Sequence, residues 1–253
     1  MAHVPERISY GSSPVEYGEL RLPAGDGPHP VAVLIHGGFW KEMWTLDLMD
    51  GLAVDLAANG WASWNIEYHR VGGGGGWPTT LEDVGQAIDF LRKLADEHNL
   101  DLSNIAAIGH SAGGHLALWS AARPQLYDEE PVKENVLKPH RVVGLAAVAD
   151  LAVAHEMGLG SGAVEELMRR DPEGGPERYR SASPAELVPL GVDQLLVHGT
   201  DDESVPVDVA RGYAAKAAAA GDTVTLHEVA GGDHFVVIDP SSAAWRAVVK
   251  WLG

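Results

Sequence analysis

Short apolar runs alternate along this chain with longer stretches of helical periodicity, and this alternation most restricts the folds open to it. Continuous apolar runs at residues 31–37 and 104–110 suit strands that are buried on both faces. Residues 46–58 and 80–98 repeat apolar side chains at the spacing of an amphipathic helix. Buried strands joined by amphipathic helices predict an α/β fold, with a mostly parallel central sheet and helices on both faces.

The expected elements fill the chain with no linker between them, so we expect one domain over residues 1–253. Further strands are expected at residues 15–23, 62–68, 142–150, 194–200 and 223–229, and further helices at 111–121, 207–220 and 241–252. Residues 151–182 are partly helical and rich in Gly, Pro and charge. This segment predicts a small cap inserted within the domain.

Charge and composition exclude several classes of function. The chain has 36 acidic and 18 basic residues, a net charge of −18, and such a surface repels phosphate backbones. We therefore expect no nucleic-acid partner. The absence of cysteine excludes disulfides and thiolate metal sites. No secretory leader and no apolar run of membrane-spanning length is visible, so we expect a cytoplasmic protein without a membrane partner.

A candidate nucleophile follows the buried run at 104–110. In parallel sheets, ligands bind beyond the carboxyl ends of the strands, so the residues just after each strand are candidate site residues. Here the chain reads Gly109-His110-Ser111-Ala112-Gly113, the G-x-S-x-G pattern between a strand and a helix. That context predicts a nucleophile elbow with Ser111 as the nucleophile and the N–H of Ala112 as an oxyanion donor.

A glycine loop follows the strand at 31–37 and reads His36-Gly37-Gly38-Phe39-Trp40. Acyl transfer passes through an oxyanion that needs preorganised N–H donors. Glycine lets the backbone approach a ligand closely, so the N–H groups of Gly38 and Phe39 are the candidate donors. We expect His36 to hold the loop.

Two later strand ends supply an acid and a base. Asp201 and Asp202 follow the strand at 194–200, and His234 follows the strand at 223–229 after a glycine pair. Nucleophile, then acid, then histidine is an established chain order of a catalytic triad. His234 is therefore the candidate general base, and either aspartate can orient its imidazole.

The segments HGGFW, GHSAGGHLA, HGTDDESVP and GGDHF together resemble the α/β-hydrolase superfamily, over about residues 15–251. The branches most similar are the HGG-containing esterases related to hormone-sensitive lipase, the kynurenine-formamidase-like enzymes and the catalytic domains of prolyl-oligopeptidase type. In such families the acid lies in an H-G-x-x-D-x-x-V-P pattern. This resemblance implies Asp202 as the acid, with Asp201 as the alternative.

The resemblance implies an α/β-hydrolase fold and a serine hydrolase that cleaves short-chain or aryl carboxylic esters through an acyl-enzyme, without a cofactor or metal. An aryl formamidase acting on N-formylkynurenine-type amides is the alternative, motivated by HGGFW. A peptidase and a non-catalytic binding protein are weaker hypotheses. Trp40 and His110 are candidate contacts to the small-molecule ester or amide, although core packing is the alternative role for each. Assembly into a homodimer is left open.

Overall fold

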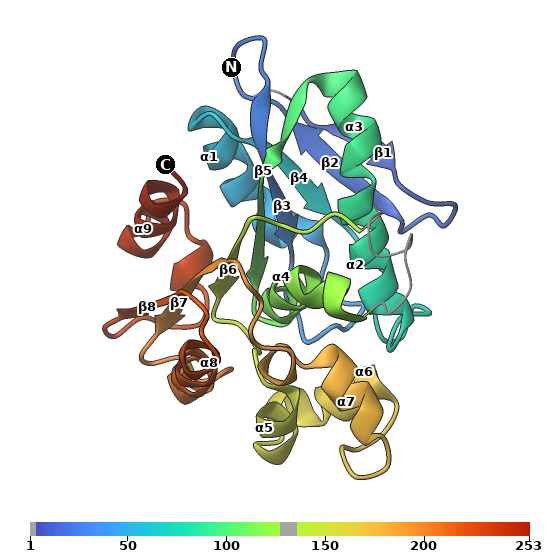
Figure 1. Cartoon of the computed structure of the whole chain (residues 1–253), viewed down its shortest axis with the longest axis vertical. Helices are drawn as coiled ribbons and strands as arrows, with labels where there is room; N and C mark the ends of the chain where they lie inside the picture. Colours follow the sequence, from blue (N-terminus) through green and yellow to red (C-terminus); the bar gives the residue numbers. More distant parts are fainter. Residues whose placement is uncertain (1–3, 127–135) are drawn as a thin grey trace.

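The computed structural model describes residues 4–126 and 136–253, and the described strands form one eight-stranded sheet (Figure 1). The sheet order is β1-β2-β4-β3-β5-β6-β7-β8. β1 pairs antiparallel with β2, and β2 with β4, whereas the pairings from β4 across to β8 are parallel. The strands are β1 (Glu6–Ser9), β2 (Tyr17–Arg21), β3 (His29–Ile35), β4 (Ala62–Ile66), β5 (Leu100–His110), β6 (Arg141–Leu145), β7 (Asp193–Gly199) and β8 (Val224–Val229).

Helices cover both faces of the sheet, as the alternating pattern predicts. Alternate side chains of β3 divide between two hydrophobic clusters: Val31 and Val33 pack with α2, α3, α4 and α8, while Ala32 and Leu34 pack with α1 and α9. The helices are α1 (Asp50–Ala58), α2 (Thr79–Asp89), α3 (Leu91–His98), α4 (Ala112–Ala122), α5 (Leu151–Glu156), α6 (Ala163–Met168), α7 (Pro176–Ala182), α8 (Val207–Ala219) and α9 (Ala243–Leu252). None of the described helices combines the length and the apolar character needed to cross a membrane.

Three elements differ from the expectations. β1 was not predicted, because three of its four residues are polar and exposed at the edge of the sheet. The single helix expected over residues 80–98 is divided at Phe90 into α2 and α3. The strand expected over 142–150 ends at Leu145, since Ala146 has a positive φ of 47° that leaves the extended conformation.

The segment predicted as a small cap holds α5, α6 and α7, which lie together beyond the carboxyl ends of the strands (Figure 1). It contacts the loop that follows β3. A Cβ atom on Gly160 would lie 2.6 Å from the ring of Phe39, and Lys41 pairs with Glu166 at 3.2 Å. Its role as a cap, and the single-domain boundaries, stay predictions.

Candidate active site

Ser111 lies in a sharp turn between β5 and α4. Its φ of 55° and ψ of −117° are unusual for a residue with a side chain and store about 1–3 kcal/mol of strain. Gly109 and Gly113, which lie two residues to either side of Ser111, have no room for a side chain. A Cβ atom on Gly109 would overlap the carbonyl oxygen of Gly113, and one on Gly113 would overlap that of Ile35. The N–H of Ser111 donates to the Leu145 carbonyl at 2.8 Å, which fastens the turn to the end of β6.

The structure brings His234 and Asp202 into direct contact. His234 Nδ1 lies 2.6 Å from Asp202 Oδ2, and both residues are buried. The other carboxylate oxygen accepts hydrogen bonds from the N–H groups of Ser204 and Val205, each at 2.8 Å. Asp201 instead faces solvent. The geometry therefore places Asp202, rather than Asp201, where an imidazole-orienting acid belongs.

Hydrogen bonds stabilise the ionised form of Asp202. Burial raises the pKa of this carboxyl, but bonds from His198, His234 and the Val205 N–H outweigh it and hold the pKa well below its usual range. His198 lies 3.3 Å from Asp202 and is buried. His198 was not predicted as a site residue, although it is the histidine of the same H-G-x-x-D pattern. An ionised Asp202 keeps the Nδ1 proton of His234 facing it and leaves Nε2 free to act as a base.

Ser111 and His234 line one cavity, and His110 lies beside both. No hydrogen bond joins Ser111 to His234 among the described residues, and such bonds often form only when substrate binds. His110 Nε2 donates to the carbonyl oxygen of His234 at 3.0 Å, so it helps to place the base. Burial lowers the pKa of His110 to about 3, so its ring is neutral at ordinary pH. His110 thus lines the cavity, and its contact with substrate stays a prediction.

Backbone donors are free at the same cavity. Gly38 and Phe39 line it together with Ser111, and both have positive φ values, of 109° and 51°. Among the described residues, the N–H groups of Gly38, Phe39 and Ala112 donate to no protein acceptor. Three unpaired donors beside a serine hydroxyl can stabilise the oxyanion of a tetrahedral intermediate.

The structure does not place Trp40, the predicted substrate contact, at this cavity. Trp40 is fully buried, and its indole N–H donates to His115 Nδ1 at 3.2 Å. The physical reason is local, because Phe39 and Trp40 both have positive φ and the Trp40 side chain packs against α4. The exposed aromatic side chains that line the cavity are instead Trp44 and Phe235, at 40% and 46% exposure.

The cavity is small. Its volume is about 120 Å³, below the roughly 300–1,000 Å³ of sites for drug-sized ligands. Leu48, Ser204 and Phe235 line it but were not predicted as site residues. Phe235 could have been found as the neighbour of His234, but Leu48 is brought in only by the path of the loop after β3. The lining residues are Gly38, Phe39, Trp44, Leu48, His110, Ser111, Ser204, His234 and Phe235.

The partner of Trp40, His115, makes folding stability sensitive to acid. Its Nδ1 accepts from Trp40 and its Nε2 donates to the Ala182 carbonyl at 2.9 Å, so the ring is neutral. Burial lowers the pKa of His115 to about 4, whereas an unfolded histidine has a pKa of about 6.5. Between these values the unfolded chain binds more protons, so stability falls as pH falls.

We expect His115→Gln to reduce the difference in unfolding free energy between about pH 7 and about pH 4.5 by ~2 kcal/mol, because glutamine does not titrate. Urea denaturation of both proteins at both pH values measures this difference. An unchanged difference would show that His115 does not titrate as the structure indicates.

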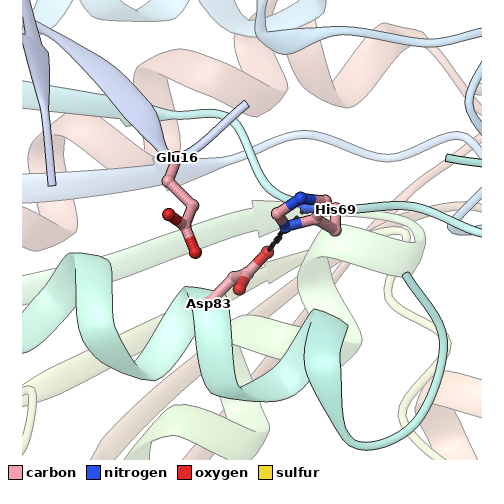
Figure 2. A group of neighbouring side chains, drawn as sticks. All are labelled: Glu16, His69 and Asp83. Carbon is pink, nitrogen blue, oxygen red and sulfur yellow. Dashed lines mark hydrogen bonds and ion pairs between the residues drawn. The ribbon is translucent and has the colours of Figure 1, made fainter. Parts of the chain in front are cut away.

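A second histidine–carboxylate group lies away from this cavity, in the loop after β4 and on α2 (Figure 2). The potential ligand atoms of Glu16, His69 and Asp83 lie within 4.8 Å of one another. Both nitrogens of His69 already have partners: Nδ1 lies 2.7 Å from Asp83 Oδ2, and Nε2 lies 2.8 Å from Ser13 Oγ. The Glu16 carboxylate accepts from the Ser13 N–H at 2.7 Å and would repel an oxyanion there. We interpret the group as a structural link between residues 13–16, the loop after β4 and helix α2.

Comparison with known proteins adds independent evidence. A family model described as BD-FAE matches residues 19–216. Esterase LipC of Mycobacterium tuberculosis is 30% identical over 217 residues, which cover 82% of this chain and 53% of that protein. The probable carboxylic ester hydrolase LipM of the same organism is also 30% identical, with 81% and 50% covered. This chain thus spans about half the length of the curated relatives it matches.

Solved structures share the fold. A truncated carbohydrate esterase from gut microbiota has a TM-score of 0.86 at 21% identity, with 99% of this chain and 95% of that chain covered. A thermophilic esterase of the Planctomycetes species Thermogutta terrifontis has a TM-score of 0.80 at 20% identity, with 98% and 89% covered. Together with the esterase relatives, they confirm the resemblance to esterases with the α/β-hydrolase fold.

Proposed function

Because this chain belongs to the BD-FAE family, we propose that it hydrolyses short-chain or aryl carboxylic esters with a Ser111–His234–Asp202 triad. One observation carries the proposal: the 2.6 Å contact between His234 and Asp202 lies at a cavity that also holds Ser111 and unpaired backbone donors. The named esterase relatives LipC and LipM support the same chemistry. Rapid release of p-nitrophenol from p-nitrophenyl acetate tests it.

The geometry supports a two-step acyl transfer. His234 Nε2 takes the proton of Ser111 as the hydroxyl oxygen attacks the ester carbonyl carbon. The carbonyl oxygen becomes an oxyanion and accepts hydrogen bonds from the donors of the cavity. The C–O bond to the alcohol then breaks, and His234 returns the proton to the leaving alcohol. Water attacks the acyl-enzyme by the same steps and releases the acid, so no cofactor is required.

The small cavity predicts a preference for short acyl chains. We expect kcat/KM to fall at least about 10-fold from p-nitrophenyl butyrate to p-nitrophenyl octanoate, since each misfit methylene costs about 1–3 kcal/mol. Leu48→Ala should enlarge the cavity and reduce this preference. Octanoate turnover equal to that of butyrate in the wild-type protein would contradict the assignment of this cavity to the acyl group.

An aryl formamidase is the second candidate. The small cavity suits a formyl group, and the exposed edges of Trp44 and Phe235 can contact an aromatic amine. Parallel assays with N-formylkynurenine and p-nitrophenyl acetate separate the two functions. Good ester turnover with no amide turnover removes this candidate. A cytoplasmic location and a homodimer stay predictions.

A further inference from the structure

Glu67 follows β4 directly and is 2% exposed, yet it carries a carboxylate. The side chain reaches the loop over residues 36–46, which supplies the Gly38 and Phe39 donors. We propose that Glu67 is a positioning residue of the oxyanion hole, holding this loop in the shape that presents its N–H groups to substrate. The inference rests on the proposed esterase function and deepens it.

Glu67 ties the two ends of the loop together. Its Oε1 lies 2.9 Å from Nε2 of His36, at the start of the loop, and its Oε2 accepts from the N–H of Leu46, at the end, at 3.2 Å. The next residue, Tyr68, reinforces the first contact. Its hydroxyl donates to the His36 carbonyl at 2.8 Å, and its ring stacks on the imidazole at 4.4 Å. One carboxylate therefore sets the span of the loop.

A third contact reaches the donors through Arg70. Its guanidinium lies 3.4 Å from Glu67 Oε1 and also donates to the carbonyl oxygen of Trp44. The Trp44 side chain lies against Gly38 so closely that a Cβ atom on this glycine would overlap it. Displacement of the Arg70 side chain would therefore shift Trp44, which packs on the candidate oxyanion donor Gly38.

The loop needs such support because its backbone is strained. Phe39 and Trp40 have φ values of 51° and 57°, which residues with side chains adopt only where surrounding contacts enforce them. Burial raises the pKa of Glu67, but bonds and charges from His36, Tyr68 and Arg70 outweigh it and lower the pKa. The carboxylate is thus ionised and can accept all of its hydrogen bonds at once.

Asp83 offers a control, because it is a buried acid that also contacts a histidine ring and accepts from a backbone N–H (Figure 2). It contacts the ring of His69 at 2.7 Å and accepts from the His69 N–H at 2.7 Å. None of its hydrogen bonds reaches the loop over residues 36–46 within the described chain. Loss of a buried carboxylate alone should therefore have similar structural effects in Asp83→Asn and Glu67→Gln.

The test compares an acetate ester with the thionoacetate of the same alcohol. Backbone N–H groups stabilise an oxygen anion better than a sulfur anion, so an ordered oxyanion hole favours the oxygen ester. We expect Glu67→Gln to lower kcat for the oxygen ester about 10-fold with KM nearly unchanged, and to lower the oxygen-to-sulfur rate ratio similarly. Asp83→Asn should keep the wild-type ratio.

A Glu67→Gln protein with the wild-type ratio would overturn the proposal, even if its melting temperature fell. If this variant does not fold, Arg70→Lys takes its place, since lysine keeps the charge but cannot reproduce the planar fork of arginine. It should lower the ratio by a smaller factor, and an unchanged ratio would overturn the proposal equally. Failure of the esterase function itself would appear separately, as no ester turnover by the wild-type protein.

Discussion

Replacement of Ser111 by alanine is expected to lower kcat/KM for p-nitrophenyl acetate by about 10⁵-fold, which corresponds to ~7 kcal/mol of lost transition-state stabilisation. The variant keeps the oxyanion donors and the His234–Asp202 contact, but it has no atom that can form the acyl-enzyme. Folding should be preserved, because the removed hydroxyl makes no protein hydrogen bond in the described structure. Steady-state kinetics and a fluorophosphonate probe, which labels an activated serine, measure the effect.

Ser13→Ala is the matched control for this experiment. Ser13 also lies in a serine–histidine–aspartate chain, 2.8 Å from His69, which is 2.7 Å from Asp83. The Glu16 carboxylate accepts from the N–H of Ser13 and would repel an oxyanion there. Ser13→Ala should retain wild-type kinetics and labelling. If labelling survived in Ser111→Ala and disappeared in Ser13→Ala, the nucleophile would have been assigned to the wrong serine.

The central strands were predictable because burial on both faces demands continuous apolar runs. In β3, the side chains from Val31 to Ile35 pack alternately into the two hydrophobic clusters on opposite faces of the sheet, so none can be polar. The edge strand β1 is mostly exposed and needs no continuous apolar run, so the sequence pattern did not predict it. The break at Phe90 was also invisible, because the apolar stripe continues from Ile88 to Leu91 on the same face of the sheet.

The chemistry of the site was predictable from strand ends, because parallel strands deliver their carboxyl ends to one edge of the sheet. That rule placed Ser111 and His234 together without knowledge of any loop. The assignment of Trp40 to the substrate had no such basis. It depends on the left-handed backbone at Phe39 and Trp40, which large side chains rarely adopt and which the sequence pattern does not show.

Replacement of Asp202 by asparagine is the second change with a large expected effect, a loss of kcat by about 10⁴-fold. Asparagine can still accept from the N–H groups of Ser204 and Val205 through its oxygen, so the loop should keep its shape. Its amide NH₂ would then face His234 Nδ1 as a donor. The imidazole would carry its proton on Nε2, where it cannot accept the proton of the serine.

Asp201→Asn separates this effect from a general change of charge. The two aspartates are neighbours, but Asp201 is exposed, and among the described residues its carboxylate accepts only from the hydroxyl of Thr200. We expect its kcat to stay within about 2-fold of wild type, because a solvated surface charge contributes little at this site. KM should be nearly unchanged in both variants, since the acid acts on the base and not on bound ester. A large loss in Asp201→Asn with a small one in Asp202→Asn would move the catalytic acid to Asp201, and the 2.6 Å contact to His234 would then be structural only.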